Sequence, residues 1–156
     1  MPTMTGIERI ARILRRQPVD RIGLFEHFWS DTQKVWTEQG HIREGEHLGD
    51  HFGFDLELCW PFNLVADLDY VPEVIEETEE TILTRNGNGA LFRTHKLHSS
   101  TPEHVGFLVQ DRAGWEEHIK PRLTPDRRRI NVEAYRAAKQ HAREHNRFFA
   151  WSGVNV

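Results

Sequence analysis

The chain has 156 residues and a mass of 18.3 kDa, which is enough for one domain with a substantial core. Hydrophobic residues make up 38% and charged residues 28%, and the net charge of −4 argues against a surface for nucleic acid or anionic membrane. No apolar run reaches the roughly 18 residues of a membrane span, the amino terminus lacks a signal-peptide core, and the single cysteine, Cys59, excludes an internal disulfide, so we expect a cytoplasmic protein.

Three helices are predicted before residue 53. Thr5 and Glu8 form a capping box that starts the first helix, which carries apolar residues at helical spacing. Ser30 and Gln33 form a second capping box, and Gly53 closes the third helix. The predicted ranges are about 5–16, 30–40 and 41–51.

Three segments are predicted as strands of a sheet. Ile22–Phe25 is a short apolar run, Phe54–Trp60 alternates strictly between apolar and polar residues, and Arg147–Ser152 is a second apolar run. A short helix begins at Asp111, and Asn131 caps a longer one before the last strand. This alternation of strands and helices is typical of a parallel sheet with crossover helices.

A β-hairpin is predicted over residues 81–98. Residues 86–89 read Asn-Gly-Asn-Gly and offer two overlapping tight turns that require positive φ. A loop centred on 86–87, on 88–89 or on all four residues pairs odd positions of the first arm with even positions of the second. In each of these registers Leu83 and Phe92 share one face of the hairpin. The opposite face carries Ile82, Leu91 and Leu97.

Six groups of short motifs follow one another along nearly the whole chain. They are Pro18-Val19-Asp20-Arg21-Ile22 with Phe28-Trp29, His51-Phe52-Gly53-Phe54-Asp55, Val74-Ile75-Glu76-Glu77-Thr78-Glu79-Glu80, Lys96-Leu97-His98-Ser99-Ser100-Thr101-Pro102, Val109-Gln110-Asp111-Arg112 with Trp115-Glu116, and Lys120-Pro121-Arg122-Leu123. On these motifs the chain resembles the uroporphyrinogen decarboxylase superfamily, in the branch of bacterial decarboxylase-like proteins grouped with the corrinoid-linked methyltransferases. The resemblance implies a (β/α)₈ TIM barrel, which typically needs about 250 residues. We therefore expect an α/β fold in which residues 1–156 form a single partial domain, the amino-terminal part of such a barrel, with about three barrel strands and an inserted β-hairpin.

The resemblance also indicates where a site would lie. On the barrel, Ile22–Phe28, Phe54–Trp60 and Phe148–Ser152 would be the first three strands, and chemistry takes place at their carboxyl ends. Glu26 and His27 are then the candidate catalytic residues, because an imidazole there could bind a metal or move a proton near neutral pH. The candidate substrate-binding residues are Trp29, Asn63 and Asp67.

The expected reaction follows from the same resemblance. Uroporphyrinogen decarboxylases carry an arginine-rich motif after the first strand, where this chain has Glu26-His27-Phe28-Trp29, so the paired-arginine grip on substrate carboxylates is missing. We expect the complete enzyme to transfer a methyl group, with a corrinoid protein as partner, or to decarboxylate a small molecule. The methyltransferase branch binds zinc through a His and two Cys in the second half of its barrel, so no zinc ligand is expected in this chain, and the isolated chain is not expected to be active.

Ten histidines raise the question of a metal site. Two pairs lie four residues apart on predicted helices: His47 with His51, and His141 with His145. Neither pair has a neighbouring cysteine or the glutamate of a zinc-protease helix, so we interpret both pairs as surface residues. His95 and His98 are three residues apart on the returning hairpin arm and would lie on opposite faces if the strand continues to His98; we interpret both as structural.

Two other functions stay open. The chain could be a free-standing, non-catalytic α+β module that binds a partner through the 81–98 hairpin, or a histidine-based metal binder. The acidic run of Glu76, Glu77, Glu79 and Glu80 is interpreted as a solvated face, and Cys59 as a buried, inert thiol.

Overall fold

The computed structural model describes residues 3–152, which divide into two compact units. The first unit contains residues 3–28, 32–63 and 130–152, and the second contains residues 29–31 and 64–129. The first unit is made of α1 (Gly6–Leu14), most of α2 (Ser30–Glu38), α3 (Leu48–Phe52), β1 (Leu56–Cys59), α5 (Val132–Glu144) and β6 (Phe148–Trp151). The second is made of β2 (Glu73–Glu77), β3 (Thr81–Arg85), β4 (Ala90–His95), β5 (Glu103–Phe107), α4 (Arg112–Gly114), a π-helical turn (Trp115–Ile119) and two 3₁₀ turns (Lys120–Arg122, Arg127–Arg129).

The first two predicted helices are confirmed, with small shifts at their ends, but the third, predicted over 41–51, begins only at Leu48. Residues 41–47 form bends and a turn instead, with Gly45 at a φ of 71°. The Thr5 hydroxyl accepts the backbone N–H of Glu8 at 3.2 Å, and the Glu8 carboxylate accepts that of Thr5 at 2.9 Å, so the capping box starts α1. Gly53 closes α3 in the left-handed conformation, with φ of 65°. Among residues 3–152 no helix combines the length and the apolar character that crossing a bilayer requires.

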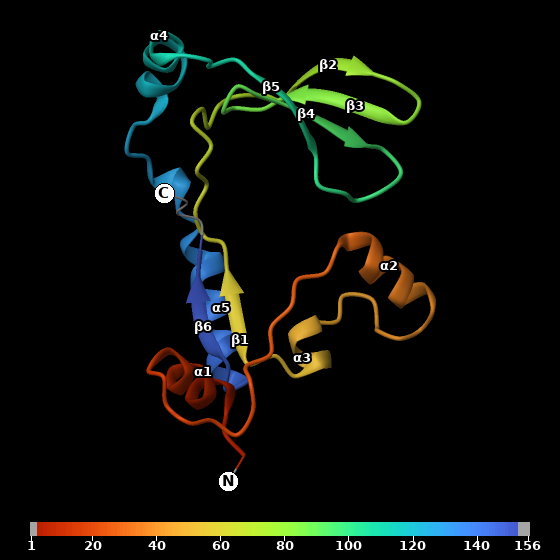
Figure 1. Ribbon diagram of the computed structural model, residues 1–156, viewed down its shortest axis with the longest axis vertical. Helices are drawn as coiled ribbons and strands as arrows, with labels where there is room; N and C mark the ends of the chain where they lie inside the picture. Colours follow the sequence, from red (N-terminus) through yellow and green to blue (C-terminus); the bar gives the residue numbers. More distant parts are fainter. Residues whose placement is uncertain (1–2, 153–156) are drawn as a thin grey trace. The chain divides into compact units, whose positions relative to one another are not determined.

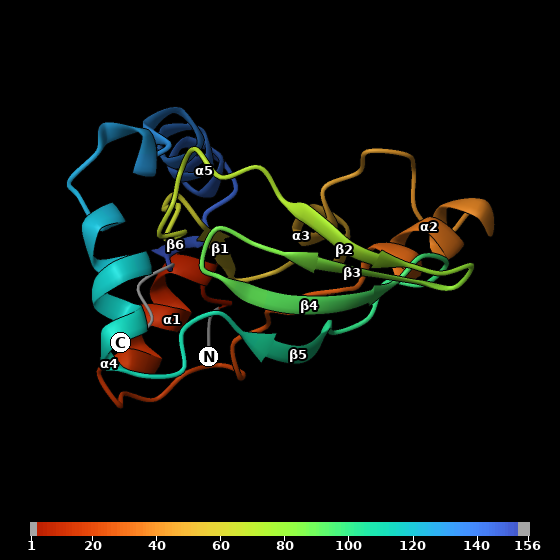
Figure 2. The same cartoon turned by 90° about the horizontal axis from the view of Figure 1, so that it is seen from above.

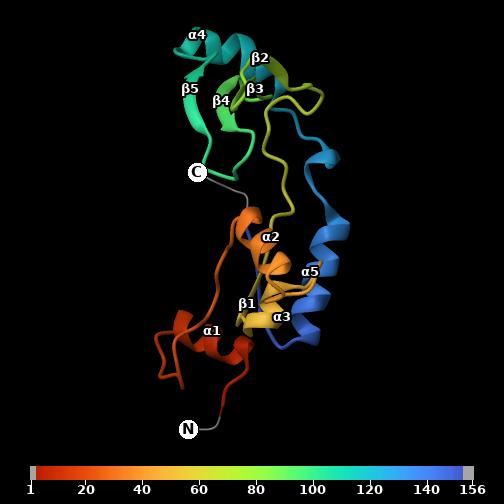
Figure 3. The same ribbon diagram turned by 90° about the vertical axis from the view of Figure 1, so that its right-hand side faces the viewer.

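The first unit is built on a parallel pair of strands, β1 and β6 (Figure 1). Leu56 is aligned with Phe148 at one end and Cys59 with Trp151 at the other. Helix α5, which leads into β6, packs against this pair of strands (Figure 3). The ring of Tyr135 on α5 meets that of Phe149 on β6 edge-on, with centroids 5.2 Å apart. Two of the three predicted barrel strands are thus strands, and the mixed α/β class is confirmed. Two strands do not close a barrel, so the barrel stays a prediction.

The prediction of a strand at Ile22–Phe25, and of a first barrel strand at Ile22–Phe28, is wrong for this structure. These residues pair with no other strand among those described, and Ile22 is 84% exposed. Leu24 is held instead by Asp55: its N–H donates to the Asp55 carboxylate at 2.8 Å, and its carbonyl accepts the Asp55 N–H at 2.9 Å. The carboxylate and the backbone N–H of Asp55 thereby bond to the backbone groups of Leu24 that a neighbouring strand would otherwise pair with. The apolar pattern of residues 22–25 does not show that Asp55 provides these bonds.

The second unit is built on a four-stranded antiparallel sheet with the strand order β2-β3-β4-β5 (Figure 2). The predicted hairpin supplies its two central strands, β3 and β4. The edge strands β2 and β5 were not predicted. Strand β2 ends with Glu76 and Glu77, the first two residues of the acidic run, and every one of its residues is exposed. Acidic side chains on an exposed edge strand discourage pairing with other chains, so the charge run is compatible with β structure.

The predicted hairpin register is wrong by one residue. Leu83 lies opposite Arg93 and Thr84 opposite Phe92, so odd positions pair with odd ones and Leu83 and Phe92 lie on opposite faces. The cause is the loop: Asn86 pairs with Ala90, and only Gly89 adopts a positive φ, of 72°, among the two loop glycines. Three residues then form the loop, with a turn followed by a left-handed glycine.

Strand β4 ends at His95 and does not continue to His98, so the condition for placing these two side chains on opposite faces is not met. The two imidazole rings stack with centroids 4.8 Å apart. The chain turns after His95, where the N–H of Leu97 donates to His95 Nδ1 at 3.0 Å.

Asn131 caps α5 as predicted, and this cap gives a first testable result. Its side-chain oxygen accepts the N–H of Ala134 at 2.9 Å. Replacing Asn131 by alanine leaves that donor without its partner, and we expect the free energy of unfolding of the first unit to fall by about 1 kcal/mol. Urea denaturation followed by NMR of the β1 and β6 amides measures the change. Asn131→Asp keeps a capping oxygen and should be close to the unsubstituted protein; an equal loss in both variants would contradict the capping role.

Candidate functional site

Glu26 and His27, the predicted catalytic residues, line a hollow of about 840 Å³ in the first unit. We call it the β1 hollow because consecutive residues of β1 form part of its wall. The apolar side chains of its wall are Phe25, Phe28, Leu48, Phe54, Leu56, Leu58 and Trp60. The polar ones are Glu26, His27, Gln33, Glu46, His47 and Glu57. Small-molecule sites typically have about 300–1,000 Å³ and a mainly apolar wall with a few polar groups, and the β1 hollow fits that description.

The charge of the β1 hollow favours one class of ligand. Three carboxylates, Glu26, Glu46 and Glu57, line it, and none of the described residues in its wall is lysine or arginine. A ligand with several carboxylates would meet like charges without a basic partner. The wall therefore suits a neutral or cationic small molecule.

Glu26 and His27 are both exposed, and their contact is local. The Glu26 carboxylate accepts the backbone N–H of His27 at 2.8 Å. The backbone thus orients the carboxylate, while the imidazole of His27 contributes separately to the wall of the hollow.

The predicted substrate-binding residues do not line the β1 hollow. Asn63 is an exposed residue of the first unit, and Trp29, 52% exposed, and Asp67 belong to the second unit. The Asp67 carboxylate accepts Arg122 Nε at 2.9 Å, which is a structural ion pair. Their grouping with Glu26 stays a prediction of the barrel model.

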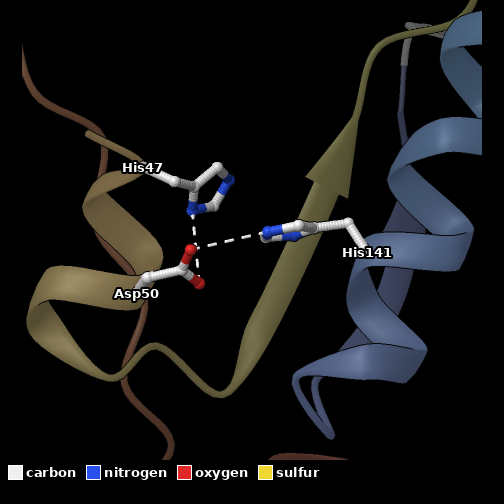
Figure 4. Close-up of side chains that lie close together, drawn as sticks. All are labelled: His47, Asp50 and His141. Carbon is white, nitrogen blue, oxygen red and sulfur yellow. Dashed lines mark ion pairs between the residues drawn. The ribbon is translucent and has the colours of Figure 1, made fainter. Parts of the chain in front are cut away.

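A second group of polar side chains gathers around Asp50, between α3, β1 and α5 (Figure 4). We call it the Asp50 cluster; its members are His47, Asp50, Glu57, His141, His145 and Arg147. His47 is the N-cap residue of α3, which also carries Asp50, and Glu57 lies on β1. His141 lies on α5, His145 caps the carboxyl end of that helix, and Arg147 directly precedes β6. One ligand atom each of His47, Asp50 and His141 lies within 4.8 Å of the others, so these three residues could hold a metal ion.

Arg147 and Glu57 organise the Asp50 cluster. The Arg147 side chain is only 4% exposed and donates to Asp50 Oδ1, to Glu57 Oε2 at 3.0 Å and to the carbonyl of Phe54 at 3.2 Å. Burial alone raises the pKa of Asp50, but the hydrogen bond and the charge of Arg147, with the nearby histidines, outweigh it and hold that pKa below its usual range. Asp50 is therefore a carboxylate at neutral pH.

Sequence reasoning noted both histidine pairs but missed what joins them. His47 and His141 lie 94 positions apart in the chain, and their rings are 4.4 Å apart between centroids. No sequence motif marks the other members of the cluster, Asp50, Glu57 and Arg147. The available signal was weak: two i,i+4 histidine pairs on helices that flank a strand with a glutamate on its polar face.

Cys59 is buried, with 7% exposed, as predicted. Burial, and then the charge of Glu57, raise the pKa of its thiol. We expect an aromatic disulfide reagent at pH 7.5 to react with Cys59 at least about tenfold more slowly in the native protein than in denaturant, because the thiolate is scarce and shielded. Absorbance of the released thiol measures both rates, and equal rates would contradict an inert Cys59.

No protein-family model, no curated protein and no solved structure matches this chain. The resemblance to the uroporphyrinogen decarboxylase superfamily therefore remains a prediction from short motifs. A function has to be argued from the geometry and the charge of the β1 hollow and the Asp50 cluster.

Proposed function

We propose that this chain supplies a (β/α) segment of a uroporphyrinogen decarboxylase-like TIM-barrel enzyme, and that the β1 hollow binds its small-molecule substrate. The observation that carries the proposal is that Glu26 and His27, chosen from the sequence, line a hollow of about 840 Å³ beside β1. The parallel pairing of β1 and β6 around α5 supports it, because this is the repeating unit of such a barrel.

The acidic wall of the hollow favours methyl transfer over decarboxylation of a polycarboxylate. A methylated amine carries a positive charge that Glu26 can balance, and the aromatic side chain of Trp60 lines the same wall. His27 would hold or move a proton at the substrate, and a corrinoid protein would be the methyl acceptor. The zinc of the methyltransferase branch would be bound by the other half of the barrel.

An NMR titration of the isotope-labelled chain tests this assignment. We expect trimethylammonium to shift the amide signals of residues 25–28 and 56–60, and an octacarboxylic porphyrin to leave them unchanged. His27→Ala should weaken the trimethylammonium response, whereas His41→Ala, an exposed histidine outside the wall, should not. Shifts with the porphyrin alone, or equal responses in both variants, would contradict the proposal.

The alternative of a partner-binding hairpin has less support. Strands β3 and β4 are paired on both sides within the sheet, so the 81–98 hairpin offers no free hydrogen-bonding edge. A partner that adds a strand would have to use β2 or β5. Loss of binding to such a partner on substitution within β5, with the β1 hollow intact, would favour this alternative.

A further inference from the structure

We propose that the Asp50 cluster is a binding site for one divalent transition-metal ion of the zinc class, with His47, His141 and Asp50 as ligands and His145 as the fourth. This site is separate from the zinc ligands that the family resemblance implies. The argument depends on which ring nitrogens carry protons and on where the others point.

Glu57 determines the protonation pattern of two rings. Its Oε1 lies 3.2 Å from His47 Nε2, and its Oε2 lies 3.2 Å from His141 Nδ1. A carboxylate only accepts hydrogen bonds, so both of these nitrogens carry a proton. The lone pairs of the neutral rings are then on His47 Nδ1 and His141 Nε2.

His145 is constrained in the same way. Its Nδ1 lies 3.0 Å from the carbonyl oxygen of His141, which also only accepts, so Nδ1 carries the proton and Nε2 the lone pair. The arrangement of a ligating imidazole whose other nitrogen donates to a carboxylate or a carbonyl is the usual outer shell of protein metal sites.

All three lone pairs face Asp50, and Figure 4 shows this for His47 and His141. His141 Nε2 is 3.6 Å from Asp50 Oδ2, while His145 Nε2 is 3.6 Å and His47 Nδ1 is 3.8 Å from Asp50 Oδ1. A tetrahedral zinc ion with bonds of about 2.0–2.2 Å holds its ligand atoms about 3.4 Å apart. The ligand atoms of His47, Asp50 and His141 lie within 4.8 Å of one another, so the ion would draw these three together, and His145 would approach as the fourth ligand from its contact with Asp50.

Acceptor nitrogens that face carboxylate oxygens repel one another unless a cation lies between them. Three separate protons could supply that charge, but one divalent ion does so for all three rings at once. Arg147 does not replace it: its Nη1 reaches His47 Nδ1 only at 3.4 Å, and one guanidinium against the carboxylates of Asp50 and Glu57 leaves a negative charge in excess. The side chains of His47 and His145 are 44% and 39% exposed, which leaves a path for an ion to enter.

Equilibrium dialysis and calorimetry with Zn²⁺, on protein first treated with a chelator, test the proposal. We expect one Zn²⁺ per chain, and a cobalt(II) derivative with the visible absorption of tetrahedral nitrogen–oxygen coordination. His141→Ala should weaken Zn²⁺ binding by at least about 100-fold, and Glu57→Gln, which alters only the outer shell, by about 10- to 100-fold.

His51→Ala is the matched control, because His51 lies on α3 but bonds to Glu46 outside the cluster, and we expect it to bind Zn²⁺ like the unsubstituted protein. If His141→Ala does not fold, His141→Gln can be used in its place, because the glutamine amide can still donate a hydrogen bond to Glu57. Absence of Zn²⁺ binding in the unsubstituted protein, or equal affinity in the His51 and His141 variants, would overturn the site. No substrate is present in this experiment, so its failure would leave the proposal for the β1 hollow untouched.

Discussion

Replacing Asp55 by alanine should lower the free energy of unfolding of the first unit by about 3 kcal/mol, because it removes a buried carboxylate that pairs with both Arg9 and Arg21, although Arg9 keeps its second partner, Asp20. Arg9 is 2% exposed and donates through Nη1 to Asp55 Oδ1, and Arg21 donates to the same carboxylate at 2.6 and 3.0 Å. The carboxylate also accepts the N–H of Leu24. Asp55 therefore joins α1, the segment around Leu24 and the entry to β1. The loss is measured by urea denaturation with NMR detection of the β1 and β6 amides.

Asp69→Asn is the matched control for Asp55. Asp69 pairs with Arg128 on the surface of the second unit, where solvent screens the charges, so its replacement should leave the unfolding midpoint nearly unchanged. A comparable loss in both variants would show that the effect does not come from burial.

The pH dependence gives an independent check on Asp55. Burial alone raises its pKa, but hydrogen bonds from Arg21 and Leu24 and the charges of Arg21 and Arg9 outweigh that effect, so its pKa in the folded state lies below the usual range. The Arg9 hydrogen bond likewise lowers the pKa of Asp20. Stability from such groups is complete above the unfolded-state pKa of about 3.9 and is lost as the pH falls through the folded-state value. Asp55→Asn should therefore flatten the decline in stability between about pH 5 and pH 2, and an unchanged slope would contradict this assignment.

Replacing Arg147 by methionine should cost a similar amount, about 3–5 kcal/mol. The methionine fills much of the same volume, but the Glu57 carboxylate, 11% exposed, would then face Asp50 without the guanidinium between them. Amide hydrogen exchange in β1 and β6 should accelerate accordingly.

A double-mutant cycle isolates the charge interaction at Arg147. Glu57→Gln added to Arg147→Met should recover part of the loss, because it removes the carboxylate that the arginine neutralised. Arg112→Met is the control, since Arg112 forms a surface pair with Glu116 and its loss should change little. If Arg147→Met were as stable as the unsubstituted protein, the Asp50 cluster would not depend on its buried cation.

Local rules were enough to predict three helix ends of this protein. Thr5, Gly53 and Asn131 act through hydrogen bonds and backbone angles within a few residues, so their roles could be predicted from the sequence. The alternation of 54–60 and the apolar run before residue 152 likewise predicted β1 and β6, because burial of one face leaves a periodic pattern.

Tertiary structure decided the features that depend on a partner from elsewhere in the chain. The segment around Leu24 has the composition of a strand, but the Asp55 carboxylate takes up its backbone N–H. The hairpin register followed from which glycine took a positive φ, and the sequence offered two. Edge strand β2 was not predicted, because its glutamates were interpreted as part of a solvated acidic run.

The same division applies to the candidate sites. Glu26 and His27 were chosen as residues at the carboxyl end of a predicted first strand; that strand is not formed, but both residues line the β1 hollow. The Asp50 cluster could not be predicted, because its members are spread from residue 47 to residue 147 and only the pairing of β1 with β6 brings them together. Helix propensity and capping depend on residues close together in the chain, so they can be predicted from the sequence. The Asp50 cluster depends on residues from α3, β1 and α5 that come together only when the chain folds.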